Sequence, residues 1–224
     1  DTRGNILYCV SHLNGLMFKS GGTYMDKQIL IALGRTCGSG GHVVAERIAE
    51  HFGISLYDKN ILKHIADENN SDYEELVKYD EKKRNIFLSR KYNEHNASME
   101  DVLAQMQADF IKEKAASGES FVVVGRCADV ALHGNENLIT IFVNAEDDAR
   151  IKRIMTADKL SEKEAKVFIE KKDKQRRNYH DSHGVEGWGD ATTYDICISS
   201  SYFGIEETAD FLCTYIEKRM AKLK

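Results

Sequence analysis

The sequence contains no proline, no pair of cysteines with CxxC spacing and no apolar run long enough to cross a membrane. Without proline, glycine is the only residue left that strongly interrupts helices and strands. The five cysteines are scattered and odd in number, which indicates neither a disulfide framework nor a zinc site. No succession of charged, apolar and small residues resembles a signal peptide. Together these absences predict a cytoplasmic protein.

A basic surface is also missing, because the formal net charge is -5 at pH 7. Nucleic acid is therefore not expected as a partner, since its binding calls for clustered Lys and Arg, and no membrane association is expected either. The length of 224 residues suits one α/β domain with a full core, over residues 25–224. Residues 1–24 are interpreted as a tag or an N-terminal extension. Their apolar residues leave open an arm that packs on a partner subunit, and with it a homo-oligomer.

Apolar runs alternate with helical periodicity along residues 25–224. The runs that predict strands are 29–33, 54–58, 121–125, 138–143 and 194–198. The longer runs are continuous rather than alternating, which is typical of parallel strands covered by helices on both faces. The polar stretch within about 59–117 predicts a helical insertion. The fold class is therefore α/β with a largely parallel sheet.

A glycine-rich loop follows the first strand and precedes a helix. It contains Gly34, Gly38, Ser39, Gly40 and Gly41. Backbone amides in such a loop, at the positive end of a helix dipole, form a phosphate cradle. The simpler alternative is a tight turn that needs glycine for its geometry alone.

This loop departs from the P-loop pattern GxxxxGK[ST], in which the lysine reaches the phosphates and the hydroxyl binds Mg²⁺. Gly41 stands at the position of the lysine and His42 at that of the hydroxyl. The loop therefore predicts a phosphate site whose cation comes from elsewhere in the chain.

Charged residues follow three of the expected strands. Arg35 lies in the glycine loop, Asp58 and Lys59 follow the second run, and Arg126 and Asp129 follow the third. Ligands of parallel α/β sheets gather at the carboxyl ends of the strands, so these side chains are candidate ligand contacts. Arg126 could instead pair with Asp129 at the surface, and Asp58 could cap the next helix rather than orient a ribose or base.

The helix that opens with a capping box at Ser161 ends in the basic run KKDKQRRNYHDSHG. Two interpretations stay open for residues 158–190. In one, this is a solvated helix end; in the other, it is a lid that closes Arg176 and Arg177 onto the transferred phosphate. His180 and His183 lie three residues apart, but no third ligand shows a matching pattern, so no metal site is predicted.

Three segments resemble the cytidylate-kinase-like family, divergent relatives of CMP kinase in the P-loop nucleoside monophosphate kinase superfamily. The first is GRTCGSGG with AERIAEHFGISLYDKNIL behind it. The second is VVVGRCADV followed by ITIFVNAEDDARIKRIM, and the third is the basic helix with the last strand and helix. The resemblance implies a three-layer α/β/α fold with about five parallel strands, a helical insertion and a lid.

The resemblance also implies a function, the transfer of the ATP γ-phosphoryl group to CMP, dCMP or a related small acceptor, with ATP and Mg²⁺. Carried over by position, the loop from Gly38 to Gly41 holds the donor phosphates and Arg126 holds the acceptor phosphate. Charge neutralisation falls to Arg150, Arg153, Arg176 and Arg177. Because the P-loop lysine is absent, Arg35 or a lid arginine is expected to replace it. The alternative is a non-catalytic nucleotide sensor on the same fold.

Overall fold

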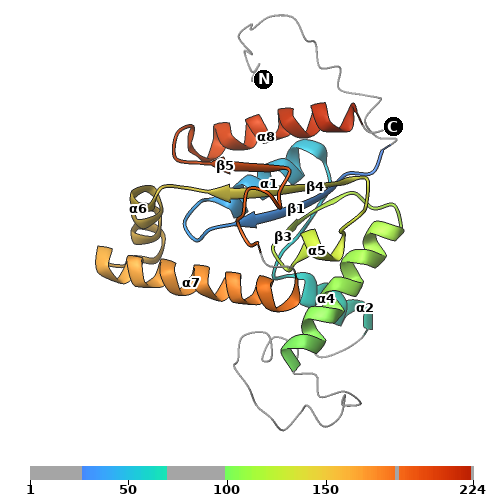
Figure 1. Ribbon diagram of the computed structural model, residues 1–224, viewed down its shortest axis with the longest axis horizontal. Helices are drawn as coiled ribbons and strands as arrows, with labels where there is room; N and C mark the ends of the chain where they lie inside the picture. Colours follow the sequence, from blue (N-terminus) through green and yellow to red (C-terminus); the bar gives the residue numbers. More distant parts are fainter. Residues whose placement is uncertain (1–26, 70–98, 185–186, 223–224) are drawn as a thin grey trace, which may run out of the picture.

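A parallel five-stranded sheet forms the centre of the protein (Figure 1), as the continuous apolar runs predict. The computed structural model describes residues 27–69, 99–184 and 187–222. The strand order is β2-β3-β1-β4-β5. The strands are β1 (Leu30–Arg35), β2 (Ser55–Tyr57), β3 (Phe121–Val124), β4 (Leu138–Asn144) and β5 (Ile196–Ser199).

Helices cover both faces of this sheet, so each strand serves two cores. Ile31 and Leu33 of β1 pack with α1 (Gly41–Phe52) and α8 (Gly204–Met220). Leu30 and Ala32 face the opposite core, which belongs to α2 (Ile61–Asn69), α4 (Met99–Ala116) and α5 (Ala128–Ala131). Successive strand side chains point to opposite faces, which explains why β1 is apolar without interruption from Leu30 to Leu33.

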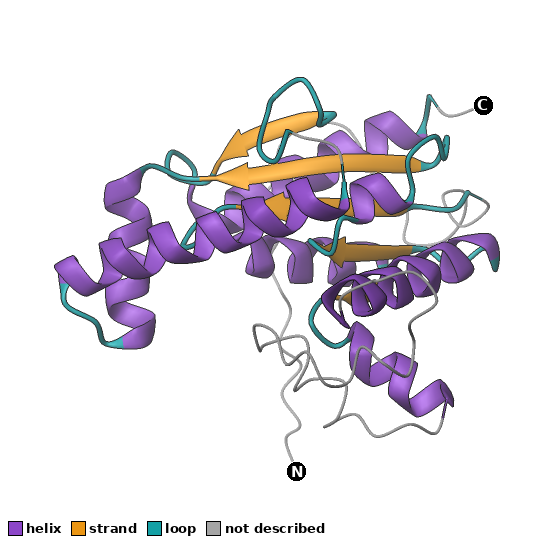
Figure 2. Ribbon diagram, turned by 60° about the horizontal axis from the view of Figure 1, so that its bottom comes forward, coloured by secondary structure: helices purple, strands orange, loops and turns teal. Residues whose placement is uncertain are grey.

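Two further helices lie beyond the carboxyl ends of the strands. α6 (Asp147–Asp158) follows β4, and α7 (Glu162–His183) runs from beside α6 back toward α5 (Figures 1 and 2). The predicted capping box is present at the start of α7, where the Glu164 carboxylate accepts from the Ser161 amide at 2.9 Å. Parallel pairing brings the loops after β1, β2 and β3 to one edge of the sheet, where α7 crosses.

The last strand begins two residues later than the apolar run predicts. The Asp195 carboxylate accepts from the Thr140 amide at 2.8 Å, and the Asp195 amide donates to the Thr140 hydroxyl at 2.9 Å. These side-chain bonds replace the backbone ladder, so β5 starts at Ile196. Helix α7 ends at His183, within the predicted basic run.

Residues 1–24 and the middle of the expected insertion lie outside the described residues, so the predicted domain boundaries stay predictions. Within residues 27–69, 99–184 and 187–222, no helix is both long enough and apolar enough to cross a membrane.

Candidate functional site

A cavity of about 530 Å³ opens where the carboxyl ends of β1, β2 and β3 meet α7. Five of the predicted loop residues line it, namely Gly34, Gly38, Gly40, Gly41 and His42. The predicted charged residues that line it are Arg35, Asp58, Lys59, Arg126, Asp129 and Arg176. Segments far apart in the sequence therefore meet at one site, as expected for residues that follow parallel strands.

The glycine loop needs its glycines for backbone conformation and for close packing. Gly38 and Gly40 have φ angles of 76° and 77°. A Cβ on Gly38 would lie 2.8 Å from the Arg150 carbonyl oxygen, and one on Gly40 would lie 2.5 Å from Ile205. Ser39 is fully buried, and its hydroxyl donates to the Thr36 carbonyl at 2.9 Å. The loop thus leads into α1 with the first-turn amides at the cavity.

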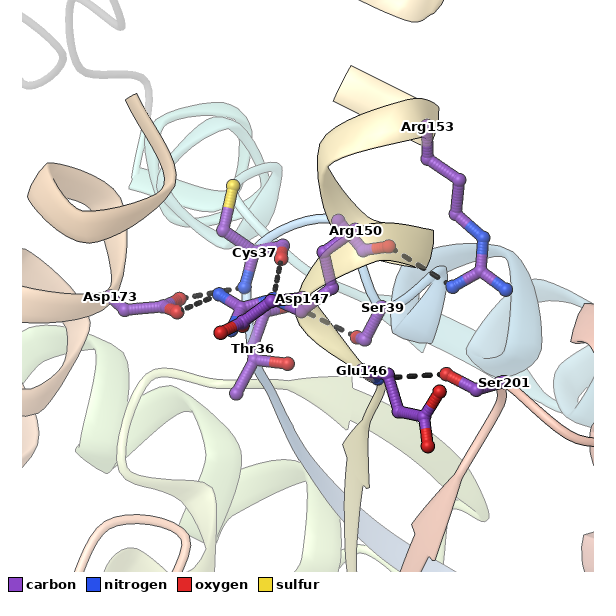
Figure 3. A network of polar contacts seen from close by, with 10 residues as sticks. Thr36, Cys37, Ser39, Glu146, Asp147, Arg150, Arg153, Asp173 and Ser201 are labelled. Carbon is purple, nitrogen blue, oxygen red and sulfur yellow. Dashed lines mark hydrogen bonds and ion pairs between the residues drawn. The ribbon is translucent and has the colours of Figure 1, made fainter. Parts of the chain in front are cut away.

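Arg150 holds this loop through polar contacts (Figure 3) and does not line the cavity. It is 9% exposed, and its Nε donates to the Cys37 carbonyl at 2.7 Å. Its guanidinium also pairs with Asp147 at 3.1 Å and with Asp173 of α7. Asp173 accepts a second bond, from the Cys37 amide, at 2.6 Å. One arginine and one carboxylate thereby tie the glycine loop to α6 and α7.

Arg153, one turn further along α6, makes a second tie. Its Nη1 donates to the Gly38 carbonyl at 3.1 Å and to the Ser200 hydroxyl at 2.9 Å. The Ser200 hydroxyl in turn donates to the Ser39 carbonyl at 2.6 Å. Arg150 and Arg153, here called the frame arginines, contact the back of the loop and do not line the cavity. Their assignment to nucleotide binding stays a prediction.

Arg35, Arg126 and Arg176, here called the cavity arginines, come from three different elements. The Arg35 guanidinium lies against Gly125, where a Cβ would be 2.3 Å from Nη1. Arg176 donates to the Arg35 carbonyl at 3.2 Å. Burial, then Arg176 and then Arg126, lowers the pKa of Arg35 to about 9. In the described part of the chain, no carboxylate forms an ion pair with Arg35 or Arg176, so this positive cluster favours an anionic ligand.

A strained turn at the end of β3 places Arg126 and Asp129. Gly125, Arg126 and Cys127 have φ angles of 77°, 58° and 53° in succession. Two consecutive non-glycine residues in the left-handed region cost free energy, and such strain concentrates at functional sites. Asp129 then lies in the first turn of α5, where its Oδ2 is 2.8 Å from the Nε2 of His180.

Asp58 takes part in the turn before α2, which is one of the two roles that the sequence leaves open, and the contact to a ribose or base stays a prediction. Its Oδ1 accepts from the Asn60 amide at 2.9 Å in the turn before α2. Its Oδ2 lies 3.7 Å from the Nε2 of His42, and both residues line the cavity. Lys59 lines the cavity beside it.

Arg177 lies outside the cavity, and its guanidinium sits 5.3 Å from the centre of the Trp188 ring. Its catalytic assignment stays a prediction. Trp188 and Tyr194 line the cavity, and both rings pack against Phe142. Burial raises the pKa of Tyr194. Sequence reasoning missed these two aromatic residues. Trp188 lies in a glycine-containing loop, which gives no periodicity by which to orient it, and Tyr194 was expected only as the first residue of the last strand.

Four residues of α7 also line the cavity without having been predicted as ligand contacts. They are Lys172, Gln175, Tyr179 and His180. The signal for Lys172 and Tyr179 was helical spacing, since they share a face with Arg176. His180 was considered only as a metal ligand. Among the described residues, no group of three His, Cys, Asp or Glu side chains is arranged to hold a metal ion.

The cytidylate kinase-like family matches residues 30–202, which span the glycine loop, the strained turn, both sets of arginines and β5. The chain belongs to the cytidylate kinase-like family. Its fold is a three-layer α/β/α architecture around a parallel five-stranded sheet.

Two cytidylate kinases are similar to this member of the family over most of their length. The one from Methanopyrus kandleri is 28% identical over 193 residues, which cover 84% of this chain and 93% of that protein. The one from Pyrobaculum neutrophilum is 24% identical over 200 residues, with 87% and 98% covered.

Two solved structures are similar in fold. An uncharacterized protein from Eubacterium ventriosum is 35% identical, with a TM-score of 0.67 over 85% of this chain and 99% of that one. The shikimate kinase from Acinetobacter baumannii, solved in complex with shikimate, is 15% identical, with a TM-score of 0.50 over 88% and 96%. The second likeness concerns the fold alone.

Proposed function

We propose that the protein transfers the γ-phosphoryl group of ATP to CMP, dCMP or a related small acceptor. One observation carries the proposal: a glycine loop and three arginines from separate elements line the same cavity. Membership of a kinase-like family supports a nucleotide-binding phosphotransferase. The two relatives named cytidylate kinase favour a pyrimidine acceptor.

The cavity arginines supply what phosphoryl transfer asks of a protein, which is positioned positive charge. The first-turn amides of α1 and the glycine loop hold the donor phosphates. Arg35 lies between this loop and the turn at Gly125, so it takes the place of the missing P-loop lysine, with Arg176 beside it. Arg126 holds the acceptor phosphate. A charge-assisted contact of this kind contributes about 1.5 to 3 kcal/mol.

The charges of the cavity lining suit two anionic ligands at once. Five basic side chains line it: Arg35, Lys59, Arg126, Lys172 and Arg176. Among the residues that the structure describes, the lining holds two carboxylates, those of Asp58 and Asp129. A nucleoside triphosphate together with a phosphorylated acceptor brings negative charge to these basic side chains.

Mg²⁺ fits this site as an ion that arrives with ATP. Such an ion takes most of its ligands from phosphates and water and needs only one or two protein carboxylates. Asp58 is a carboxylate of the cavity lining that lies 3.7 Å from His42 in the first turn of α1. When bound, Mg²⁺ neutralises charge on the phosphates. The protein residues position the two substrates and keep water from the reacting phosphate.

The test is turnover with ATP, Mg²⁺ and a panel of nucleoside monophosphates, read as the formation of ADP and a nucleoside diphosphate. Changing Arg126→Ala is expected to lower kcat/KM for the acceptor about a hundredfold. Arg47→Ala is the matched control, because Arg47 pairs with Glu206 on the outer surface and removing an exposed pair has little effect. Equal losses in both variants would contradict the role of Arg126.

A non-catalytic nucleotide sensor is the second candidate. One observation favours it, since neither Gly41 nor His42 offers the ammonium or the hydroxyl of a P-loop. ATP binding measured by calorimetry, combined with no product from any acceptor, would select the sensor over the kinase.

A further inference from the structure

Asp129 and His180 form an ion pair in the wall of the cavity. Asp129 belongs to the first turn of α5, and His180 to the last turns of α7. The Asp129 Oδ2 and the His180 Nε2 are 2.8 Å apart, and both residues line the cavity. The two helices approach closely at Gly184, where a Cβ would lie 2.7 Å from Val130. The pair is therefore part of the site and also joins two elements.

Carboxylates flank the imidazole ring on both sides. The Nδ1 of His180 lies 3.7 Å from the Asp181 Oδ1 and has no hydrogen-bond partner within the described chain. Arg126 and Cys127 precede Asp129, and Tyr194 lies close enough for Asp129 to raise its pKa. Hydrogen bonding to Asp129 raises the pKa of His180, although burial acts in the opposite direction. His180 thus carries more positive charge near neutral pH than an ordinary histidine.

This pairing fixes the Asp129 carboxylate through one oxygen and leaves the other oxygen able to bind a ligand. The Asp129 side chain is 17% exposed, and its Oδ2 is held by His180. Within residues 27–69, 99–184 and 187–222, its Oδ1 makes no hydrogen bond. An ionised carboxylate only accepts hydrogen bonds, so a ligand group that binds the Oδ1 must be a hydrogen-bond donor.

We propose that His180 is a positioning residue, which holds Asp129 so that its carboxylate accepts a hydrogen bond from a hydroxyl or amino group of the acceptor. The inference rests on the proposed function and adds two properties to it. The acceptor carries a donor group close to its phosphate, because Arg126 and Asp129 belong to one turn. Acceptor binding also weakens when His180 loses its proton.

The competing explanation is that the pair only fastens α5 to α7. A purely structural pair changes the free energy of unfolding and affects both substrates alike. A positioning pair changes the KM for the acceptor and leaves kcat and the KM for ATP close to their original values. The pH dependence of the KM for the acceptor further distinguishes a positioning pair from a purely structural one.

The test compares His180→Ala and His180→Gln with the wild-type protein. His180→Ala is expected to raise the KM for CMP about tenfold, since a charge-assisted bond to Asp129 is lost. His180→Gln, whose amide still donates, is expected to recover part of this loss. The wild-type KM for CMP is expected to rise between about pH 6 and about pH 9, and to stay level in His180→Gln.

His51→Gln is the matched control. In the wild type the His51 Nε2 lies 3.0 Å from the Glu217 Oε1, outside the cavity. The variant therefore also loses a histidine-carboxylate pair, but one that does not line the site. Its KM for CMP is expected to stay at the wild-type value. A KM for CMP that is unchanged in His180→Ala, or that rises together with the KM for ATP, would overturn the proposal.

Two measurements keep the inference separate from the proposed function if no acceptor supports turnover. An NMR titration follows the His180 ring and is expected to show its pKa lowered in Asp129→Asn. Calorimetry with CMP in the absence of ATP is expected to give affinity about tenfold weaker for His180→Ala than for the wild type. Equal affinities, or no CMP binding by the wild type, would overturn the positioning role.

Discussion

The frame arginines and the cavity arginines are the same residue type in one small region, yet they differ in what surrounds their charge. Arg150 pairs with Asp147 and Asp173 and donates to a backbone carbonyl. Arg35 is half-buried beside two other arginines, which help to lower its pKa to about 9. The first kind of arginine stabilises the folded loop. The second kind destabilises the empty site and therefore favours an anion.

The largest expected effect comes from replacing the charged side chain of Arg35, one of the cavity arginines, by an apolar side chain of similar length. Arg35→Met is expected to lower kcat about a thousandfold, because a preorganised cation next to the transferred phosphate is lost. The same change is expected to raise the free energy of unfolding by about 1 kcal/mol, because the repulsion of Arg35 by Arg176 and Arg126 disappears. Steady-state kinetics and urea unfolding measure the two effects. Unchanged turnover would remove Arg35 from the proposed role.

For the frame arginines, substitution is expected to change the free energy of unfolding in the opposite direction. Arg150→Met should lower the free energy of unfolding by about 3 kcal/mol, because Asp173 and the Cys37 carbonyl lose their partner while partly buried. Urea unfolding of Arg150→Met, Asp173→Asn and the double variant gives the coupling between them, expected at about 2 kcal/mol. Additive losses would mean that the pair does not act as a unit.

The glycine loop allows a matched comparison of two glycines with similar backbones. Gly38 and Gly134 have φ angles of 76° and 83°, but only Gly38 has atoms within reach of a Cβ. Gly134→Ala is expected to cost about 1 kcal/mol from backbone strain alone. Gly38→Ala is expected to cost about 2 kcal/mol and to weaken ATP binding, because it pushes the loop away from Arg150. Thermal unfolding and calorimetry with ATP test both; equal costs would contradict the close fit.

The smallest effect is expected from a change at the start of α7. Asp173 and Arg176 lie further along the same helix. Ser161→Ala removes the capping box and is expected to lower the free energy of unfolding by about 1 kcal/mol. Turnover should not change, because the cap lies far along the helix from the cavity residues. A fall in kcat would show that the two sets of arginines depend on the helix end.

The sheet was predictable because its strands are buried on both faces. Continuous apolar residues in β1, β3 and β4 leave no alternative to a covered parallel sheet. The strand order was not predicted from the residues alone, because apolar runs of similar composition do not reveal their neighbours. The predicted start of β5 was wrong by two residues, because the Asp195 carboxylate takes the Thr140 amide that a backbone carbonyl would otherwise accept from.

The cavity residues that follow strands were predictable for a geometrical reason. Arg35 ends β1, Asp58 follows β2 and Arg126 lies two residues beyond β3, and parallel strands bring such positions together. The surroundings of Arg150 were not predictable, because its partner Asp173 lies on another helix. The partner of Asp129 was missed for the same reason, since His180 reaches it only after α7 crosses back to α5.

Trp188 is the only tryptophan of the chain, and it lines the cavity. Its indole lies against the guanidinium of Arg177 and the ring of Phe142. The intrinsic fluorescence of the protein at the tryptophan wavelength therefore originates at the site itself. Ligand occupancy can be followed by emission from the unlabelled protein, and rapid mixing would resolve the order in which donor and acceptor enter.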